Sequence, residues 1–182
     1  MILSDKEIRT RIEIGDISID PLDYSKIGPC SVDLTLSPKF QIFKGFGRPY
    51  DAGNKKTIEA MTEVIEVSQN DGFLLMPGQF VLASTQEKIS ISPKLAATLE
   101  GKSSVARMGI IVHAAGLVNP GTGTNKPTQL TLEMYCMAGS SVRLPPGMEI
   151  IQILFHELSS EASVAYDNRS TSSYVGLDGP RI

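Results

Sequence analysis

Two short segments of the chain carry residue types that could do chemistry. The first is Glu100-Gly101-Lys102-Ser103-Ser104-Val105-Ala106-Arg107, in which Lys102 and Arg107 bracket two hydroxyl side chains behind a glycine. Backbone N–H groups, hydroxyls and two cations within a few residues suit the binding of a phosphate chain. The same spacing also fits a solvated helix start with serine N-caps, and the residues alone leave both interpretations open.

The second segment is Gln129–Tyr135, whose alternation predicts a strand. Thr131, Glu133 and Tyr135 share one face of that strand, and the residues between them are apolar. A carboxylate between a threonine and a tyrosine could line a polar cleft and serve as a general acid or base. Most glutamates on strands are merely solvated, so the pattern by itself does not decide for catalysis.

The stretch between these segments, His113–Gly121, begins at the end of a predicted strand. Its residues Ala114, Ala115 and Gly116 are small enough for a flat ligand to lie against the backbone. The alternative is a tight bend in a packed barrel.

Several classes of catalytic site are excluded by what the sequence lacks. The zinc-dependent base deaminases need a His-x-Glu and a Pro-Cys-x-x-Cys motif. Neither His113 nor His156 is followed by the required residues, and Cys30 and Cys136 lie far apart, so they form neither that motif nor a disulfide framework. No histidine cluster of a metal hydrolase is present, and Gly101-Lys102-Ser103 lacks the upstream glycine of a P-loop.

Composition and charge describe an ordinary globular protein. With 182 residues, 41% of them hydrophobic and 20% charged, the chain suffices for one domain with a proper core. Its 17 Lys and Arg against 20 Asp and Glu exclude a broadly basic nucleic-acid binder, but not a small basic pocket for one phosphorylated ligand. No apolar run approaches the roughly 18 residues of a membrane span, and the N-terminus is too charged for a signal peptide. We therefore expect a cytoplasmic protein with neither a nucleic-acid nor a membrane partner.

The pattern predicts one helix followed by many short strands. Ser4 and Glu7 have capping-box spacing, so we expect a helix over Asp5–Glu13 that ends near Gly15. Beyond it the apolar residues recur with a period of two, and Gly45–Lys56 is expected to be a surface loop. Strands are predicted at Ser31–Leu36, Phe40–Phe43, Glu63–Val67, Ala97–Glu100, Gly109–His113, Gln129–Tyr135 and Ile150–His156.

Two segments, Leu74–Ala83 and Val142–Ile151, repeat a strand–turn–strand plan around a Pro-Gly pair. In each, the glycine after proline fits a type II turn, which needs a positive φ, and we predict two hairpins of one all-β domain. Many short strands with such turns favour a mainly β fold, a distorted β-barrel or jelly-roll-like sandwich, over residues 1–165. Residues 166–182 are rich in Ser, Thr, Gly and Asp and predict a flexible tail, or an arm that orders on something else.

Taken together, these segments resemble the dCTP deaminase family, which shares its fold with the trimeric dUTPases. The resemblance begins with Met1-Ile2-Leu3-Ser4-Asp5 and Pro29-Cys30-Ser31-Val32-Asp33-Leu34 and runs over nearly the whole chain. Its most specific part is the Gly-Lys-Ser-Ser-x-x-Arg segment followed, in that order and separation, by Thr131-Leu132-Glu133. It implies a dUTPase-like fold with an N-terminal helix and a tail that closes over the site, in a homotrimer whose sites lie between subunits.

By this resemblance, Glu133 is the general base and acid, which takes a proton from the water that attacks C4 of a cytosine ring without zinc or another metal at the base. Ser103 and Arg107 match residues that hold the water, the ring and the glutamate, while Lys102 and Ser104 match triphosphate contacts. The other implied substrate contacts are Ala115, Asn119, Thr131, Leu132, Gln152, Tyr166 and Tyr174. Mg²⁺ would enter on the phosphates of the substrate. The implied ligands are dCTP and dUTP, with dTTP a candidate feedback inhibitor.

Three departures from the family pattern bear on the reaction. Asn119 stands where the family usually has Asp, and an amide cannot act as a base, which argues against phosphate cleavage. The short Ala115-Gly116-Leu117 bend nevertheless resembles the bifunctional members. The chain is longer than usual over residues 121–128, near the sugar position, and in the tail Ser173 and Leu177 stand where a Lys and a Gln are expected.

We therefore expect a hydrolase that deaminates dCTP to dUTP and ammonia. A bifunctional enzyme that continues to dUMP and pyrophosphate is the alternative reaction. A nucleotide-binding relative that has lost turnover and acts as a regulator is the alternative class, although such a protein would have no chemical need for Glu133.

Overall fold

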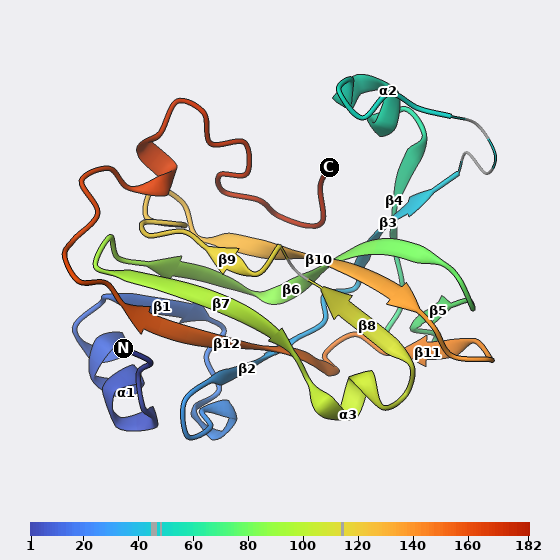
Figure 1. Ribbon diagram of the computed structural model, residues 1–182. Helices are drawn as coiled ribbons and strands as arrows, with labels where there is room; N and C mark the ends of the chain where they lie inside the picture. The colour runs from blue at the N-terminus through green and yellow to red at the C-terminus, as the bar shows by residue number, and fades with distance from the viewer. Residues whose placement is uncertain (45–46, 48, 114) are drawn as a thin grey trace.

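The computed structural model describes residues 1–44, 47, 49–113 and 115–182, which fold mainly into β-strands with a few short helices (Figure 1). The strands are β1 (Ile17–Asp20), β2 (Val32–Thr35), β3 (Lys39–Phe43), β4 (Thr62–Glu66), β5 (Phe73–Leu75), β6 (Phe80–Ile91), β7 (Leu95–Gly101), β8 (Ile110–His113), β9 (Leu117–Val118), β10 (Thr128–Cys136), β11 (Val142–Leu144) and β12 (Glu149–Glu157). The helices are α1 (Asp5–Glu13), α2 (Lys55–Glu59) and α3 (Ser103–Ala106), with the 3-10 helices η1 (Tyr24–Lys26) and η2 (Tyr166–Asn168). The mainly β fold class predicted from the sequence is confirmed.

The described strands form three sheets rather than one closed barrel. A six-stranded sheet has the order β4-β3-β6-β10-β8, with β1 also paired to β6. A four-stranded sheet has the order β2-β12-β7-β9, and β5 pairs with β11. This arrangement agrees with the predicted distorted barrel or sandwich, and it places β10 inside the larger sheet, between β6 and β8.

One cluster of buried side chains, drawn from all three sheets, forms the core. Along β12, Ile151, Ile153 and Phe155 are fully buried, while the residues between them are partly exposed. Phe40 of β3 stacks on Phe73 of β5 with ring centroids 4.2 Å apart. Each fully buried side chain of this size contributes about 1.5–3 kcal/mol of transfer free energy, so alternation along the strands supplies the main stabilisation.

The N-terminal helix α1 has the predicted bounds. The Ser4 side chain accepts a hydrogen bond from the backbone N–H of Glu7 (3.4 Å), which is half of the predicted capping box. Ile8 is fully buried and fastens one face of the helix to the core. The start signal and the apolar residue are both local, which is why the sequence alone sufficed here.

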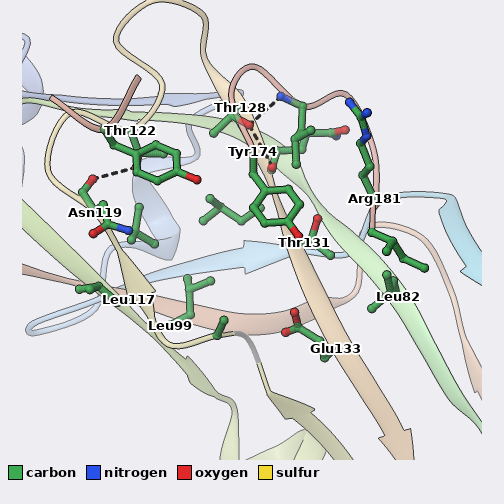
Figure 2. A pocket seen from close by; sticks show the side chains of 17 residues that line it. Leu82, Leu99, Leu117, Asn119, Thr122, Thr128, Thr131, Glu133, Tyr174 and Arg181 are labelled. Atoms are coloured by element: carbon green, nitrogen blue, oxygen red, sulfur yellow. Dashed lines mark hydrogen bonds between the residues drawn. The ribbon is translucent and has the colours of Figure 1, made fainter. Parts of the chain in front are cut away.

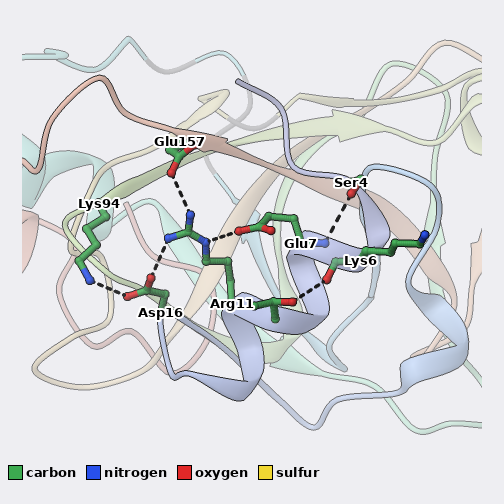
Figure 3. A network of polar contacts seen from close by, with 8 residues as sticks. Ser4, Lys6, Glu7, Arg11, Asp16, Lys94 and Glu157 are labelled. Atoms are coloured by element: carbon green, nitrogen blue, oxygen red, sulfur yellow. Dashed lines mark hydrogen bonds and ion pairs between the residues drawn. The ribbon is translucent and has the colours of Figure 1, made fainter.

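The last turn of α1 is tied to the domain by Arg11 (Figure 3). Its guanidinium donates to the carboxylates of Glu7, Asp16 and Glu157, at 2.8, 3.0 and 2.8 Å. Burial is the largest single effect on Asp16 and would raise its pKa, but the hydrogen bonds from Arg11 and Ser92 and the charges of Lys94 and Arg11 together outweigh it and lower that pKa. The network therefore stays ionised at neutral pH and holds α1 against the end of β12.

The two Pro-Gly turns form as predicted, but they do not close hairpins. Gly78 and Gly147 have φ of 74° and 78°, and in each turn the following residue donates to the carbonyl three residues earlier (3.0 and 3.2 Å). The strands before the turns, β5 and β11, pair with each other, whereas β6 and β12 after them belong to different sheets. The predicted hairpins are therefore wrong. Each turn is a corner, because β6 and β12 make longer ladders with β10 and β7 than either could make with a three-residue strand.

Sequence patterning missed several short elements. Strands β1 and β9 are too short to show a period, and α2 begins inside the predicted surface loop Gly45–Lys56. Within that loop, Gly45, Phe46 and Arg48 lie outside the described residues.

Strand β6 is far longer than its predicted part, which ended at Ala83. Beyond Ala83, Ser84, Thr85 and Glu87 are buried, so polar residues occupy core positions there and conceal the strand. Hydrophobic patterning cannot detect such a segment, because the donors that satisfy Thr85 and Glu87 come from Leu130 and Thr35, in other parts of the chain.

Residues 166–182 lie against their own domain. The Leu177 N–H donates to Thr128 Oγ1 (2.9 Å), and the Leu177 carbonyl accepts from the Gln129 N–H (3.1 Å). Lys88 and Asp178 form an ion pair at 2.9 Å. The tail therefore orders on β6 and β10 of the same chain. None of the described helices has the length and apolar character needed to cross a membrane.

Candidate active site

A cavity of about 330 Å³ opens between β10, the segment around β9 and the tail (Figure 2). Six of the predicted site residues line it: Ala115, Asn119, Thr131, Glu133, Tyr166 and Tyr174. Figure 2 shows Thr131 and Glu133 along one strand, with Tyr174 over it and Asn119 on the far side from Arg181. These residues come from three distant parts of the sequence, and the tail meets β10 only because it folds back over the sheet.

Strand β10 presents three oxygen-bearing side chains to the cavity. Gln129, Thr131 and Glu133 all line it, while Leu132 between them is fully buried in the core. One oxygen of each is buried and has no hydrogen-bond partner among the described residues: Gln129 Oε1, Thr131 Oγ1 and Glu133 Oε2. Buried oxygens are nearly always paired in folded proteins, so we expect a ligand or water to supply the missing donors.

Glu133 lies opposite His113 of β8 and Leu82 of β6 in the sheet register. Burial raises the pKa of Glu133, and smaller effects of its own backbone N–H, the His113 charge and the Ala115 N–H oppose the rise. A raised pKa lies closer to neutral pH, so the carboxylate can accept a proton and the carboxyl can return it. With one oxygen that no described residue partners, Glu133 is equipped for acid–base chemistry.

The remaining wall of the cavity is mainly aliphatic. Its larger aliphatic side chains are Leu82, Leu99, Leu117, Val118, Leu130, Leu177 and Ile182. An apolar slot beside a row of oxygen acceptors suits a flat ring whose polar edge meets those acceptors. Among the lining residues that the structure describes, Arg181 is the one cation.

The other predicted site residues form a separate group around α3. Ser103, Ser104 and Arg107 are exposed on or beside this one-turn helix, and they do not line the cavity. The interpretation of the segment as a helix start is correct locally, but Lys102 rather than a serine occupies the N-cap position. Helix α3 joins the end of β7 to β8, on the other side of the sheets from the tail (Figure 1).

Lys102 is paired with two carboxylates in this group. Its ammonium lies 2.5 Å from Asp33 and 2.7 Å from Glu149. Burial alone would lower the pKa of Lys102, but hydrogen bonds to these carboxylates raise it, so the side chain stays charged. Gln152 stands opposite Asp33 in the register and accepts a hydrogen bond from Ser31 Oγ (3.3 Å). The group thus carries the donors of a phosphate site, and one of its two cations, Lys102, is already balanced by acidic neighbours.

The cavity also has lining residues that sequence reasoning missed. Gln129 alternates with Thr131 and Glu133, so the strand pattern contained a signal for it. Leu177 lines the cavity from the tail, where no periodic pattern could have placed its side chain. Of the predicted contacts, Leu132 has a side chain that faces the core, and only its backbone is available to a ligand.

Residues 2–158 match the protein family described as dCTP deaminase-like. The match covers most of the chain, including both groups of candidate residues up to Gln152. The chain belongs to this family. Proteins named "dCTP deaminase, dUMP-forming" are similar over 99% of the chain. That of Tropheryma whipplei (strain Twist) is 42% identical over 90% of its own length, and that of Dictyoglomus thermophilum is 41% identical over 92%. That of Streptomyces avermitilis is 40% identical over 93% of its own length. The family resemblance predicted from the sequence is confirmed.

A solved structure supports the dUTPase-like fold class. The 2′-deoxycytidine 5′-triphosphate deaminase of Agrobacterium tumefaciens superposes with a TM-score of 0.66 at 20% identity, over 86% of this chain and 48% of that one. The chain therefore spans about half the length of that protein. At this identity the likeness concerns the fold alone.

Proposed function

We propose that the protein deaminates the cytosine ring of dCTP in the cavity, with Glu133 as general base and acid. The observation that carries this proposal is the buried Oε2 of Glu133, which has no hydrogen-bond partner among the described residues and lies on the wall of a largely apolar cavity. The names of relatives that are 40–42% identical indicate dCTP as the substrate.

Glu133 handles every proton in the proposed reaction. It takes a proton from water as the water oxygen bonds to C4, and gives that proton to N3 of the ring. It then removes the proton of the new C4 hydroxyl and passes it to the amino group, which leaves as ammonia while the C4 carbonyl forms. One water is consumed and one ammonia released. A positioned acid–base group of this kind contributes about 10²–10⁴-fold to the rate.

We propose that Mg²⁺ arrives on the nucleotide phosphates as part of the substrate. Within the described ranges, no group of three or more His, Cys, Asp and Glu side chains is placed to hold a metal ion. Mg²⁺ commonly keeps several waters and binds phosphate oxygens with few protein ligands, which fits this arrangement.

We further propose that a second copy of the chain completes the site, in a homotrimer. Ser103 and Arg107, which the resemblance assigns to the water and the ring, lie on α3 and away from the cavity that contains Glu133. Three apolar side chains are exposed side by side across the larger sheet: Phe80, Tyr135 and Ile111. Such a patch is typical of a contact surface, and a neighbouring chain docked there could bring its own α3 to the cavity.

Two inactive variants should restore each other in mixed oligomers. Glu133→Gln removes the base and Arg107→Ala removes the cation that the neighbouring chain is proposed to supply, so each variant alone should lose at least about 100-fold in ammonia release. In randomly mixed trimers about one quarter of the sites combine a native Glu133 with a native Arg107 from the next chain, and a corresponding activity should return. Differently tagged chains, co-purified and assayed with dCTP, provide the measurement.

A mixture of Glu133→Gln with Glu133→Ala is the matched control and should recover nothing. Absence of recovery in verified mixed trimers of Glu133→Gln and Arg107→Ala would contradict a shared site.

The fate of dUTP is a separate question, and release of dUMP and pyrophosphate is the second candidate function. The names of the relatives favour it. Asn119 opposes it, because this residue lines the cavity and its amide cannot take a proton from water.

Anion-exchange analysis of the nucleotides formed from dCTP and Mg²⁺ tests both proposals. Ammonia release with dUTP accumulation indicates deamination alone, and dUMP with pyrophosphate indicates the bifunctional reaction.

If dUTP accumulates, Asn119→Asp should raise the ratio of dUMP to dUTP by about tenfold or more, because a carboxylate can activate the water. Asn70→Asp, at an exposed turn, is the matched control and should leave the ratio unchanged. Unchanged dCTP together with saturable binding would instead support a regulator without turnover.

A further inference from the structure

The loop of residues 121–128, which the family resemblance predicts to be longer than usual, is hydrogen-bonded to the start of the tail. The Asp167 carboxylate, at the centre of η2, accepts hydrogen bonds from the backbone N–H groups of Gly123 (3.2 Å) and Asn125 (3.0 Å). The Asn125 side-chain amide also donates to the Asp167 carbonyl (3.4 Å) and to Asn168 Oδ1 (3.1 Å). The loop thus donates these four hydrogen bonds to acceptors on the tail.

The start of the same loop lies directly under η2. The Tyr166 N–H donates to the Pro120 carbonyl at 2.8 Å. Gly121 has a φ of +77°, and a Cβ there would come within 2.4 Å of the Ala165 Cβ. The backbones therefore approach so closely that only glycine fits, which fixes where η2 sits relative to the loop.

The end of the loop holds the tail a second time, beyond Tyr174. A Cβ on Gly176 would meet Lys126 Cδ at 2.9 Å, so the Lys126 stem lies directly against the tail. The next residue, Leu177, exchanges hydrogen bonds with Thr128 Oγ1 and with the backbone N–H of residue 129. Residues 166–176 are therefore anchored at both ends by one loop.

We infer that the 121–128 loop is a receptor for the tail within the same chain, and that Asp167 is a positioning residue for nucleotide binding. The anchored segment carries Tyr166 and Tyr174, and both line the cavity beside Asn119. The Asn119 carbonyl itself accepts from the Thr122 N–H and Oγ1 (3.1 and 2.8 Å), so the loop fold and this wall of the cavity are one unit (Figure 2). The nature of the ligand rests on the proposed function; the role of the loop does not.

This arrangement compensates for two residues that the tail lacks. Ser173 and Leu177 stand where the family resemblance predicts a Lys and a Gln that would close on the ligand. Here Leu177 is buried, and its backbone is held by hydrogen bonds with Thr128 and Gln129. A tail that is already held over the cavity loses less conformational entropy when the nucleotide binds.

Asp167→Ala tests the inference through the separation of KM from kcat. Losing two charge-assisted hydrogen bonds should free residues 166–176, raise KM for dCTP by about tenfold and change kcat by less than about twofold. Amide hydrogen exchange of the same residues should accelerate. Asp167→Asn keeps one acceptor oxygen and should fall between wild type and Asp167→Ala in both measurements.

Asp23→Ala is the matched control. Asp23 also accepts a backbone N–H bond at a 3-10 helix, from Ser25 at 2.9 Å in η1, but it does not line the cavity. It should leave KM and the exchange of residues 166–176 unchanged. The inference would be overturned if Asp167→Ala kept the wild-type KM and exchange rates. It would also be overturned if the Asp167 and Asp23 variants showed the same fall in kcat, the same rise in KM and the same fall in melting temperature. If the wild-type protein converts no dCTP, the proposed function fails, and the exchange rates alone decide the role of the loop.

Discussion

Glu133→Gln should abolish ammonia release from dCTP while leaving the cavity intact. An amide cannot take the proton of the attacking water, so we expect kcat to fall by about 10³-fold, within the range for loss of a general base. The substituted side chain has nearly the same size, and the aliphatic wall of the cavity does not change, so dCTP should still bind. Steady-state assays together with calorimetric titration of dCTP provide the measurement.

Glu63→Gln is the matched control for this variant. Glu63 is also a glutamate within a strand, but it is exposed on β4 and paired with Lys44. It should retain full activity. Ammonia release near the wild-type rate in Glu133→Gln would contradict the assignment of the base.

The raised pKa of Glu133 adds an expected pH dependence. Because burial raises this pKa, the acidic limb of the kcat/KM profile should have an apparent pKa above about 4.3, the pKa of an unperturbed glutamate. The folded protein also binds this proton more tightly than the unfolded chain does. The stability that this carboxyl contributes is therefore fully present below its unfolded pKa and is lost as pH rises through its folded pKa. Glu133→Gln should accordingly melt no lower than wild type at neutral pH.

Glu87→Ala should destabilise the protein more than any other single change discussed here. Glu87 is buried on β6, and its carboxylate accepts hydrogen bonds from the Thr35 N–H (2.9 Å) and Thr35 Oγ1 (2.7 Å) on β2. It thereby joins the six-stranded sheet to the four-stranded one. Removing it leaves two buried donors unpaired, and at about 1–3 kcal/mol for each, the free energy of unfolding should fall by about 2–6 kcal/mol. Urea denaturation provides the measurement.

Glu87→Gln keeps an acceptor oxygen in the same place and should lose less than half as much. A loss below about 1 kcal/mol in Glu87→Ala would show that water replaces the carboxylate and that the two sheets do not depend on this contact.

These two glutamates illustrate the limits of sequence reasoning. Both lie on strands, and the residues near Glu133 in sequence form a motif that a family resemblance could identify. Glu87 has no such motif, and its neighbours Ser84 and Thr85 made its strand look like a loop. Its role depends on Thr35, which is distant in the chain, so no local pattern could predict it.

Local physics explains what the sequence determined by itself. The helix Asp5–Glu13, the type II turns at Gly78 and Gly147 and the strand around Glu133 follow from capping, φ preferences and alternation, which act within a few residues. Both turns, however, were predicted to close hairpins, and neither does. The choice of strand partners depends on ladders with distant segments, and those are visible only in the folded chain.

Only the tertiary structure decided how the candidate site is divided. The sequence placed Lys102 and Arg107 in one site with Glu133, and the folded chain separates them because α3 turns away at the end of β7. It also decided that the tail rests on the 121–128 loop, because Asp167 and its hydrogen-bond donors at Gly123 and Asn125 are more than 40 residues apart in the sequence and meet only in the folded chain. The residues that do the chemistry are encoded in short motifs, whereas their relative positions arise from packing between segments far apart in the chain.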